Sequence, residues 1–300
     1  MSESERSTRR PLDAAALARQ QRRLQRAPQP PWLHGEVARR MALRLPMIKL
    51  QPATVLDWGS FLGAGRAALQ QAYPRAHLTA VEPDVERRDA TRRAIERPWW
   101  SRWSAAAPVL TETEVEAASA QMLWSNMGLH GAPDPEAVMS RWLRALAVDG
   151  FLMFSTLGPG TLAGLRELYR AQGWPAPAAP FVDMHDLGDM LVHAGFADPV
   201  MDQERLTLTW PDAAALLAEL RGLGGNAALD RAAGLRTPRW RARLLALLGA
   251  RTDAAGRIAL EFELVYGHAV KPPPRPRLAA ETAVPLDQMR ALVRRGRHGV

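Results

Sequence analysis

The stretch "VLDWGSFLGAG", residues 55–65, is an apolar run that ends in an acid, Asp57, and continues into a glycine-rich segment. A helix-forming segment, "RAALQQAY", follows it directly. Glycines let the backbone approach a ligand closely, and the N-terminus of a helix favours electron-rich groups. We therefore expect a strand, a tight turn carrying Gly59, Gly63 and Gly65, and a helix, which together bind a nucleotide.

A second acid supports a nucleotide site. Glu82 follows the next apolar run, residues 77–81, where the carboxyl end of a second strand would lie. In nucleotide-binding α/β sheets an acid at this place accepts hydrogen bonds from two ribose hydroxyls. The glycine spacing differs from the G-x-G-x-x-G fingerprint, which argues against a dehydrogenase. The alternative is an ordinary strand-to-helix turn without a ligand.

The rest of the chain alternates between short apolar runs and helical patterns. Alternation of this kind predicts an α/β fold, a parallel sheet with helices on both sides. Asp134 is expected to cap a helix over 135–147, and Asp183 to cap a helix that Gly195 ends. The expected strands are 54–58, 77–81, 121–125, 151–155, 204–209 and 257–270, and further helices are expected at 12–26, from Leu33, at 211–221 and at 238–248.

The formal net charge of +8 lies at the two ends of the chain. Residues 1–27 hold seven arginines and three acids, and residues 271–300 hold seven basic residues and two acids, so the body between them is nearly neutral. Solvated, flexible tails account for this pattern, and an acidic partner is the alternative. A nucleic-acid partner finds support only in the short patch "RPWWSRW" (97–103), for which packing between elements is the simpler explanation.

Composition narrows the class of protein further. The chain has no cysteine, which excludes disulfides and thiolate metal sites and fits a cytoplasmic protein. We see no signal peptide and no apolar run near the roughly 20 residues that a membrane span needs. His185 and His193 are too far apart for a paired helical ligand site, so no metal is expected.

Several segments together resemble one family of enzymes. "VLDWGS" is similar to the strand and loop of class I S-adenosylmethionine-dependent methyltransferases. "LWSNMGLH" (123–130), "GFLMFSTLGPGTLAGLRELY" (150–169), "LRGLGGN" and "FELVYGHA" resemble the malonyl-acyl-carrier-protein O-methyltransferases of biotin synthesis. The resemblance implies a doubly wound, mostly parallel seven-stranded sheet of the Rossmann-like methyltransferase type.

The resemblance also implies an organisation of the chain. Residues 1–31 would be a basic N-terminal segment, and residues 32–270 the methyltransferase domain, followed by a Pro/Arg-rich tail at 271–300. The domain would have a cofactor half (50–156) and a substrate-side half (157–270) with a helical insertion at 211–250 that covers the substrate.

Site residues carry over position by position. Asp57, Gly59 and Gly63 correspond to the cofactor loop, and Glu82 to the ribose-binding acid. Residues Asn126 and Leu129 fall where the family lines the cofactor pocket. Asn126 and His130 also become candidates for the substrate pocket near the transferred methyl, although His130 could equally be a structural histidine. The implied cofactor is S-adenosyl-L-methionine, and the implied partner is acyl-carrier protein carrying a malonyl group.

The sequence departs from the family pattern at three places. Phe61 replaces the central glycine of the loop, so its side chain either points away from the cofactor or crowds it. The acid after the third strand, near the adenine, is matched only by Glu112 or Glu114 after a shift of register. Gln121 replaces the acid that commonly opens the fourth strand.

Methylation of a carboxylate requires no general base from the protein, because the carboxylate is already ionised at neutral pH. A cation or hydrogen-bond donors should bind the malonyl carboxylate. Arg166, Lys49 and Arg44 are candidates for that cation, and each could equally be a surface residue. The arginines of "RTPRWRAR" (236–243) could dock an acidic carrier protein or could simply be solvated.

Three functions follow from these observations. The leading hypothesis is methyl transfer to malonyl-acyl-carrier protein. The second is a methyltransferase-like binding module that lost catalysis through Phe61 and the missing adenine-side acid. The third is a nucleic-acid methyltransferase that uses the basic tails, whose binding would have to weaken with salt.

Overall fold

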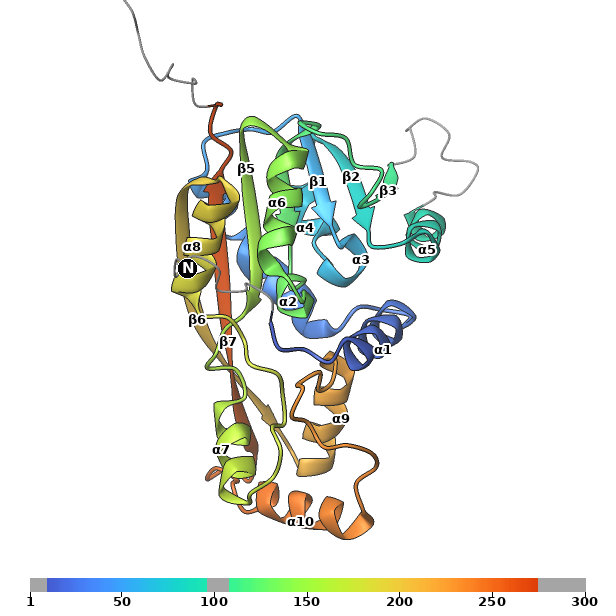
Figure 1. Cartoon of the computed structure of the whole chain (residues 1–300), viewed down its shortest axis with the longest axis vertical. Coiled ribbons are helices and arrows are strands. Elements are labelled where there is room, and N and C mark those ends of the chain that lie inside the picture. Colours follow the sequence, from blue (N-terminus) through green and yellow to red (C-terminus); the bar gives the residue numbers. More distant parts are fainter. Residues whose placement is uncertain (1–9, 96–107, 275–300) are drawn as a thin grey trace, which may run out of the picture.

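The structure is a computed structural model of the chain, and it describes residues 10–95 and 108–274. A seven-stranded sheet with the order β3-β2-β1-β4-β5-β7-β6 forms its centre. Strands β1 to β5 run parallel, whereas β7 is antiparallel to both β5 and β6. The strands are β1 (Thr54–Trp58), β2 (His77–Glu82), β3 (Val109–Thr111), β4 (Ala120–Ser125), β5 (Leu146–Leu157), β6 (Ala197–Trp210) and β7 (Ile258–Val270). The predicted mostly parallel α/β sheet is confirmed (Figure 1).

Polar side chains at helix starts explain several helix boundaries. Asp134, Asp183, Asp212 and Thr237 each accept a hydrogen bond from a backbone N–H in the first turn of the helix they precede. Two short 3-10 helices, η1 (Leu45–Met47) and η2 (Leu129–Gly131), complete the structure. The α-helices are α1 (Ala14–Gln25), α2 (Trp32–Ala42), α3 (Ser60–Gly63), α4 (Arg66–Ala72), α5 (Val85–Ile95), α6 (Pro135–Ala145), α7 (Ala163–Ala171), α8 (Met184–Ala194), α9 (Ala213–Leu223) and α10 (Pro238–Gly249).

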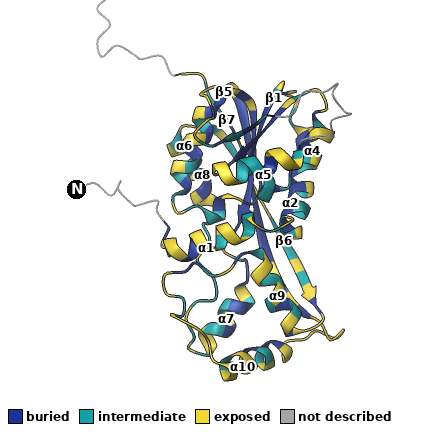
Figure 2. Ribbon diagram, turned by 90° about the vertical axis from the view of Figure 1, so that its right-hand side faces the viewer, coloured by how far each residue is buried: buried dark blue, intermediate teal, exposed yellow. Residues whose placement is uncertain are grey.

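Helices cover both faces of the sheet, and each face has its own apolar core. Figure 2 shows the buried strands between helices whose outer sides are exposed. One core joins α2 and α4 to the sheet through Leu33, Val37, Met41, Leu69 and Trp124. The other joins α6 and α8 to the opposite face through Trp142, Leu187, Leu191, Leu123 and Phe154. Alternation of Leu123 and Trp124 between the two cores is the pattern of a strand buried on both faces.

The strand order reverses between β1 and β4, because β2 and β3 lie on one side of β1 while β4 and β5 lie on the other. In open α/β sheets the crevice outside the carboxyl ends of such neighbouring strands is where ligands bind. The two strand ends here lead into Gly59 and Asn126. The topology therefore places the residues singled out in the sequence at one crevice.

The last two strands extend beyond the rest of the sheet. β6 and β7 pair from Ala197↔Val270 to Trp210↔Ile258, and their far half carries α7, α9 and α10 (Figure 1, lower part). Helices α9 and α10 lie between β6 and β7 in sequence, as predicted for the insertion. The prediction of a strand at 204–209 was too short, because the alternating pattern already begins at Ala197. The helix predicted over 135–147 ends at Ala145, since Leu146 opens β5.

The N-terminal segment differs from a solvated tail where the structure describes it. Leu12 forms an antiparallel bridge with Ala228, and the N–H of Asp13 donates to the carbonyl of Ala227 over 2.8 Å. Leu17 of α1 is 5% exposed and packs with Ala16 and Ala227. The expectation of a flexible basic end is therefore wrong for residues 10–25, which are docked against the loop that follows α9.

Some predictions concern residues outside the described ranges. The patch at 97–103 and nearly all of the tail at 271–300 lie there, so their predicted roles stay predictions. Among the described residues, no helix is both long enough and apolar enough to cross a membrane. The same residues contain no cluster of three or more His, Cys, Asp or Glu side chains suited to a metal ion.

Candidate active site

The loop after β1 folds tightly around Asp57. Gly59 has φ +70°, and a Cβ placed there would meet no atom within 4 Å, so this residue combines a left-handed backbone with open space. The short helix α3, which the sequence did not predict, then forms between Gly59 and Ala64. A Cβ on Gly65 would lie 2.3 Å from Nε1 of Trp124, which explains why the loop has a glycine here.

Asp57 itself is fully buried. Its Oδ2 accepts a hydrogen bond from the Ser60 hydroxyl over 2.6 Å, and its Oδ1 has no partner. Burial raises the pKa of Asp57 to about 6, although the Ser60 hydroxyl and the charge of Arg66 both favour the ionised form. The buried carboxylate thus fixes the start of the loop and keeps one acceptor unused.

Phe61 does not line the cavity at this crevice. Its ring lies under the guanidinium of Arg87, 3.9 Å from ring centroid to guanidinium carbon. Its backbone N–H, in contrast, donates to Oε1 of Glu82 over 2.9 Å. The ring of Phe61 thus contacts Arg87 and is not among the residues that line the cavity.

Glu82 lies at the end of β2 and lines a cavity of about 260 Å³. Its Oε1 also accepts from the hydroxyl of Thr91 over 2.8 Å, and no hydrogen bond involves Oε2 within the described structure. The residue Glu82 is 1% exposed. Burial above all, and the charge of Asp57, raise its pKa to about 7, while Thr91, Phe61 and Arg87 favour the ionised form.

A third acid reaches the same cavity. Glu112 follows β3 directly, lines the cavity, and accepts a hydrogen bond from Nε1 of Trp58 over 3.1 Å. Arg141 lies 3.4 Å away, and burial raises the pKa of Glu112. The carboxylate of Glu114 instead accepts from the N–H of Thr111 and from Arg88. Of the two acids that the sequence left open after the third strand, Glu112 is the one that lines this cavity.

Asn126 and Leu129 both line this cavity, as the family resemblance implies. The amide of Asn126 donates to the carbonyls of His34 and Gly63, over 2.7 and 2.5 Å, and its Oδ1 accepts from Ser155 over 2.6 Å. Its polar atoms are therefore engaged within the protein. Asn126 joins α2, the glycine loop and β5, which makes it a positioning residue.

His130 lines two cavities at once. The first is the cavity of Glu82, and the second is a cavity of about 350 Å³ formed by α1, α7, α9 and the loops after α7 and α9. Its Nδ1 is buried without a hydrogen-bond partner. Burial, followed by His34 and Arg10, lowers its pKa to about 3, so the imidazole is neutral at physiological pH. Leu17, Gln20 and Gly131 also border both cavities.

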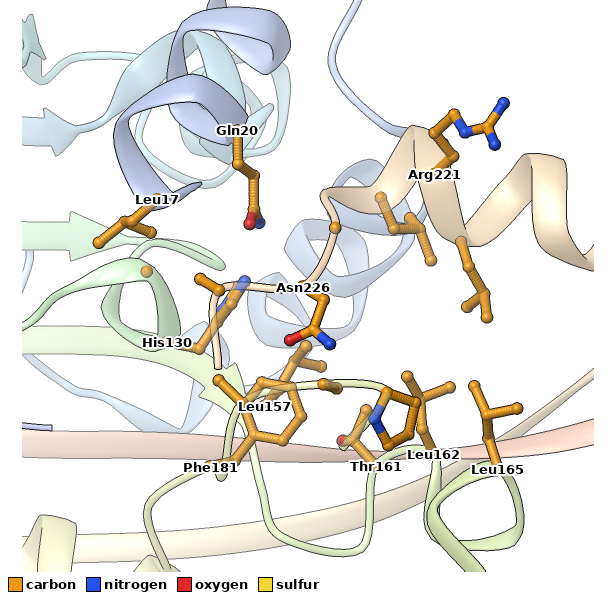
Figure 3. Close-up of a pocket in the computed structure, with 18 of the residues that line it drawn as sticks. Leu17, Gln20, His130, Leu157, Thr161, Leu162, Leu165, Phe181, Arg221 and Asn226 are labelled. Carbon is orange, nitrogen blue, oxygen red and sulfur yellow. The ribbon is translucent and has the colours of Figure 1, made fainter. Parts of the chain in front are cut away.

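The second cavity is largely apolar. Figure 3 shows Gln20 from α1, His130 and Asn226 pointing into it, with Phe181 and several leucines on its walls. Its described lining contains three arginines and no acidic residue. The leucines are Leu12, Leu17, Leu157, Leu162, Leu165, Leu217, Leu220 and Leu223.

The glycine pair after α9 brings α1 to this cavity. Gly224 and Gly225 have φ +153° and +149°, and a Cβ on Gly224 would lie 2.4 Å from Nε2 of Gln20. These positive φ values favour glycine at both positions, and the Gln20 side chain of α1 packs against Gly224. Asn226 then holds the loop, because its side chain donates to the carbonyl of Ala176 and accepts from the N–H of Ala228.

Arg166 is not among the lining residues of either cavity. Its guanidinium donates to the carbonyls of Pro159 and Ala179, over 2.6 and 3.4 Å, and so secures the loop after α7. Arg44 is also committed elsewhere, to Asp202 and the ring of Tyr266. Lys49 lines neither cavity. Sequence reasoning did not single out Arg10, a buried arginine that lines the second cavity.

The reversal of strand order, the glycine loop and the acids after β2 and β3 define a class I methyltransferase. A candidate methyltransferase from Bacillus halodurans has this fold, with a TM-score of 0.52 and 14% identity over 78% of this chain and 99% of that one. The malonyl-[acyl-carrier protein] O-methyltransferase of Laribacter hongkongensis is 40% identical over 82% of this chain and 84% of its own length. That of Gallionella capsiferriformans is 39% identical over 81% and 85%. The chain belongs to the malonyl-[acyl-carrier protein] O-methyltransferase family. This membership rests on the curated relatives, because a comparison with protein-family models found no match.

Proposed function

We propose that the protein transfers the methyl group of S-adenosylmethionine to the free carboxylate of a malonyl group carried by acyl-carrier protein. The observation that supports this most strongly is the pair of cavities that meet at His130. The first cavity has acids at two strand ends, which suit a nucleotide-like donor. The second has arginines and apolar walls, which suit an acidic acceptor on an aliphatic arm.

The residues of the first cavity fit S-adenosylmethionine. Gly59 leaves open space beside the loop, Oε2 of Glu82 has no hydrogen bond within the described structure and would accept from ribose hydroxyls, and Glu112 would face the adenine. When bound, the cofactor supplies an electrophilic methyl group on a sulfonium. The protein's own residues orient the acceptor, exclude water through α1, and hold the loop in place through Asn126.

The acceptor carboxylate needs no base, because it is ionised at neutral pH. His130 would in any case be a poor base, since burial holds its pKa near 3. Its neutral ring instead offers a buried nitrogen that a bound ligand can satisfy. The leucine walls suit the apolar arm of the acceptor, and Arg236, Arg239, Arg241 and Arg243 at α10 remain the predicted docking face for the acidic carrier protein.

The reasons for the binding-module hypothesis are weakened by the structure. That hypothesis rested on Phe61 and on a missing adenine-side acid. The ring of Phe61 lies under Arg87, outside the cavity lining, and Glu112 lines the cavity as a candidate for the adenine-side acid. Biotin synthesis as the biological setting and the cytoplasm as the location are parts of the proposal. Complementation tests the role in biotin synthesis: the gene should restore growth without biotin to a strain that lacks this methyl-transfer step, and failure of a well-expressed protein would contradict the proposal.

Phe61→Gly is expected to change the affinity for S-adenosylmethionine less than about threefold. The ring does not line the cavity, and glycine keeps the N–H that donates to Glu82. The contact with Arg87 is lost, and a partly exposed cation–π pair contributes about 0.5–1 kcal/mol. Calorimetric titration checks this, and an affinity that increases tenfold or more would mean that the ring crowds the cofactor.

Cofactor binding is expected to depend on pH through Glu82. Its pKa is raised to about 7, and only the ionised carboxylate accepts from both ribose hydroxyls with full strength. Binding therefore favours deprotonation, and affinity should rise about tenfold between about pH 6 and about pH 8, the span in which a group with this pKa ionises. Titrations across this range check the trend, and Glu82→Gln should remove it. A slope that survives in Glu82→Gln would assign the dependence to Asp57 or another group.

A further inference from the structure

We call the first cavity, which holds the donor in the proposed function, the donor cavity, and the second the acceptor cavity. Three arginines line the acceptor cavity, and they differ in burial. Arg10 is 9% exposed, whereas Arg23 and Arg221 are exposed. The guanidinium of Arg23 donates to the backbone carbonyl of Arg221. Figure 3 shows the Arg221 guanidinium pointing away from the cavity. Within the described lining, Arg10 is thus the one cation withdrawn from solvent.

The positive charge of Arg10 has no negative partner among the described residues. Its three hydrogen bonds go to the backbone carbonyls of His130, Ala132 and Pro180. A guanidinium has five N–H donors, so these three acceptors leave donors unused, and Nε is buried without a partner. Burial lowers the pKa of Arg10 only to about 10, so it stays charged at neutral pH. A buried, uncompensated cation is costly and favours a bound anion.

The position of Arg10 indicates which anion that would be. One Nη donates to the carbonyl of His130, the residue shared by the two cavities, and another donates to Pro180 in the loop beside Phe181. The charge therefore lies at the end of the acceptor cavity that borders the donor cavity. An acceptor carboxylate has to lie at that end for one of its oxygens to reach a methyl group.

We propose that Arg10 binds the free carboxylate of the acceptor and holds it beside the donor cavity. This inference rests on the proposed function and identifies the residue that selects a carboxylate substrate. A guanidinium can donate two parallel hydrogen bonds to a carboxylate, which fixes its orientation as well as its place. Methylation removes the negative charge, so the same arginine would hold the product ester more weakly and favour its release.

The test compares two ligands on the intact protein with S-adenosylhomocysteine bound. The ligands are acyl-carrier protein carrying a malonyl group and the same carrier with the malonyl methyl ester. Arg10→Met should weaken malonyl binding about 30-fold, because a charge-assisted hydrogen-bond pair is lost, and should weaken ester binding less than about threefold. Arg10→Lys, which keeps the charge but not the paired donors, should lose part of the preference for the malonyl form.

Arg257→Met is the control, because Arg257 also donates to a backbone carbonyl, that of Thr209, but lines neither cavity. It should change neither affinity by more than about threefold. Equal losses for both ligands in Arg10→Met, or none, would overturn the assignment of Arg10. If Arg10→Met does not fold, Arg10→Lys decides, since a purely structural role predicts equal losses there too. A wild-type protein that binds neither ligand would contradict the proposed function itself. If the wild type prefers the malonyl form, the proposed function is supported, and the variants then test the role of Arg10 alone.

Discussion

Glu82→Ala is expected to weaken the binding of S-adenosylmethionine at least about 100-fold. A hydrogen bond to a charged group contributes about 1.5–3 kcal/mol, and two ribose hydroxyls would share this carboxylate. About 1.4 kcal/mol corresponds to a tenfold change in affinity, so the loss of two such bonds gives the expected factor. The Phe61 N–H and the Thr91 hydroxyl would also lose their acceptor. Calorimetric titration of the purified protein measures the effect.

Two variants separate ribose binding from loop structure in this experiment. Glu82→Gln keeps an oxygen that can accept from Phe61 and Thr91, and it should lose affinity while the loop stays folded. Glu114→Gln alters an acid near the same sheet edge whose carboxylate is engaged with Thr111 and Arg88, and it should bind normally. Wild-type affinity in Glu82→Ala would remove the ribose-binding role from this residue.

Leu17→Asp is expected to lower the methylation rate at low substrate concentration at least about 100-fold while the domain stays folded. Leu17 is 5% exposed and lines both cavities, so an aspartate there must either be buried at a cost of several kcal/mol or pull α1 away. Its apolar cluster with Ala16 and Ala227 is separate from the two cores of the sheet. Without α1 both cavities lose a wall, and water reaches the reacting groups.

Ala18→Asp is the matched control for this variant, because Ala18 is the next residue of α1 and is exposed. It introduces the same side chain into the same helix and should leave activity within about threefold of the wild type. Thermal unfolding should differ little between the two variants, whereas proteolysis near α1 should be faster in Leu17→Asp. Normal activity in Leu17→Asp would show that α1 is dispensable for catalysis.

The parts of this fold that could be predicted are those determined by local sequence. The strand at Thr54–Trp58 and the helix between Asp183 and Gly195 were confirmed, because a buried apolar run and a capped amphipathic segment are visible within a short window. The four-residue helix α3 was missed, since it depends on left-handed residues at Gly59 and Ala64 that flank it. Its pattern is too short to be read from the sequence.

The candidate site was only partly predictable for a related reason. Glu82 follows a strand and could be placed at the crevice from topology alone. The choice of Glu112 needed the end of β3, which is only three residues long. Arg10 looked like one arginine of a basic tail, because its contacts with His130 and Pro180 lie 120 and 170 residues away along the chain. Only the tertiary structure brings these residues together.

In the proposed reaction an acidic acceptor in the second cavity receives a methyl group bound in the first. The direct measurement is the intact mass of malonyl-acyl-carrier protein after incubation with the purified protein and S-adenosylmethionine. We expect the carrier to gain the mass of one methylene group, to lose it again on mild alkaline hydrolysis of the ester, and to remain unmodified with Glu82→Ala. An unchanged mass in the presence of folded, cofactor-bound protein would contradict the account, as would a methyl group attached anywhere other than the malonyl carboxylate.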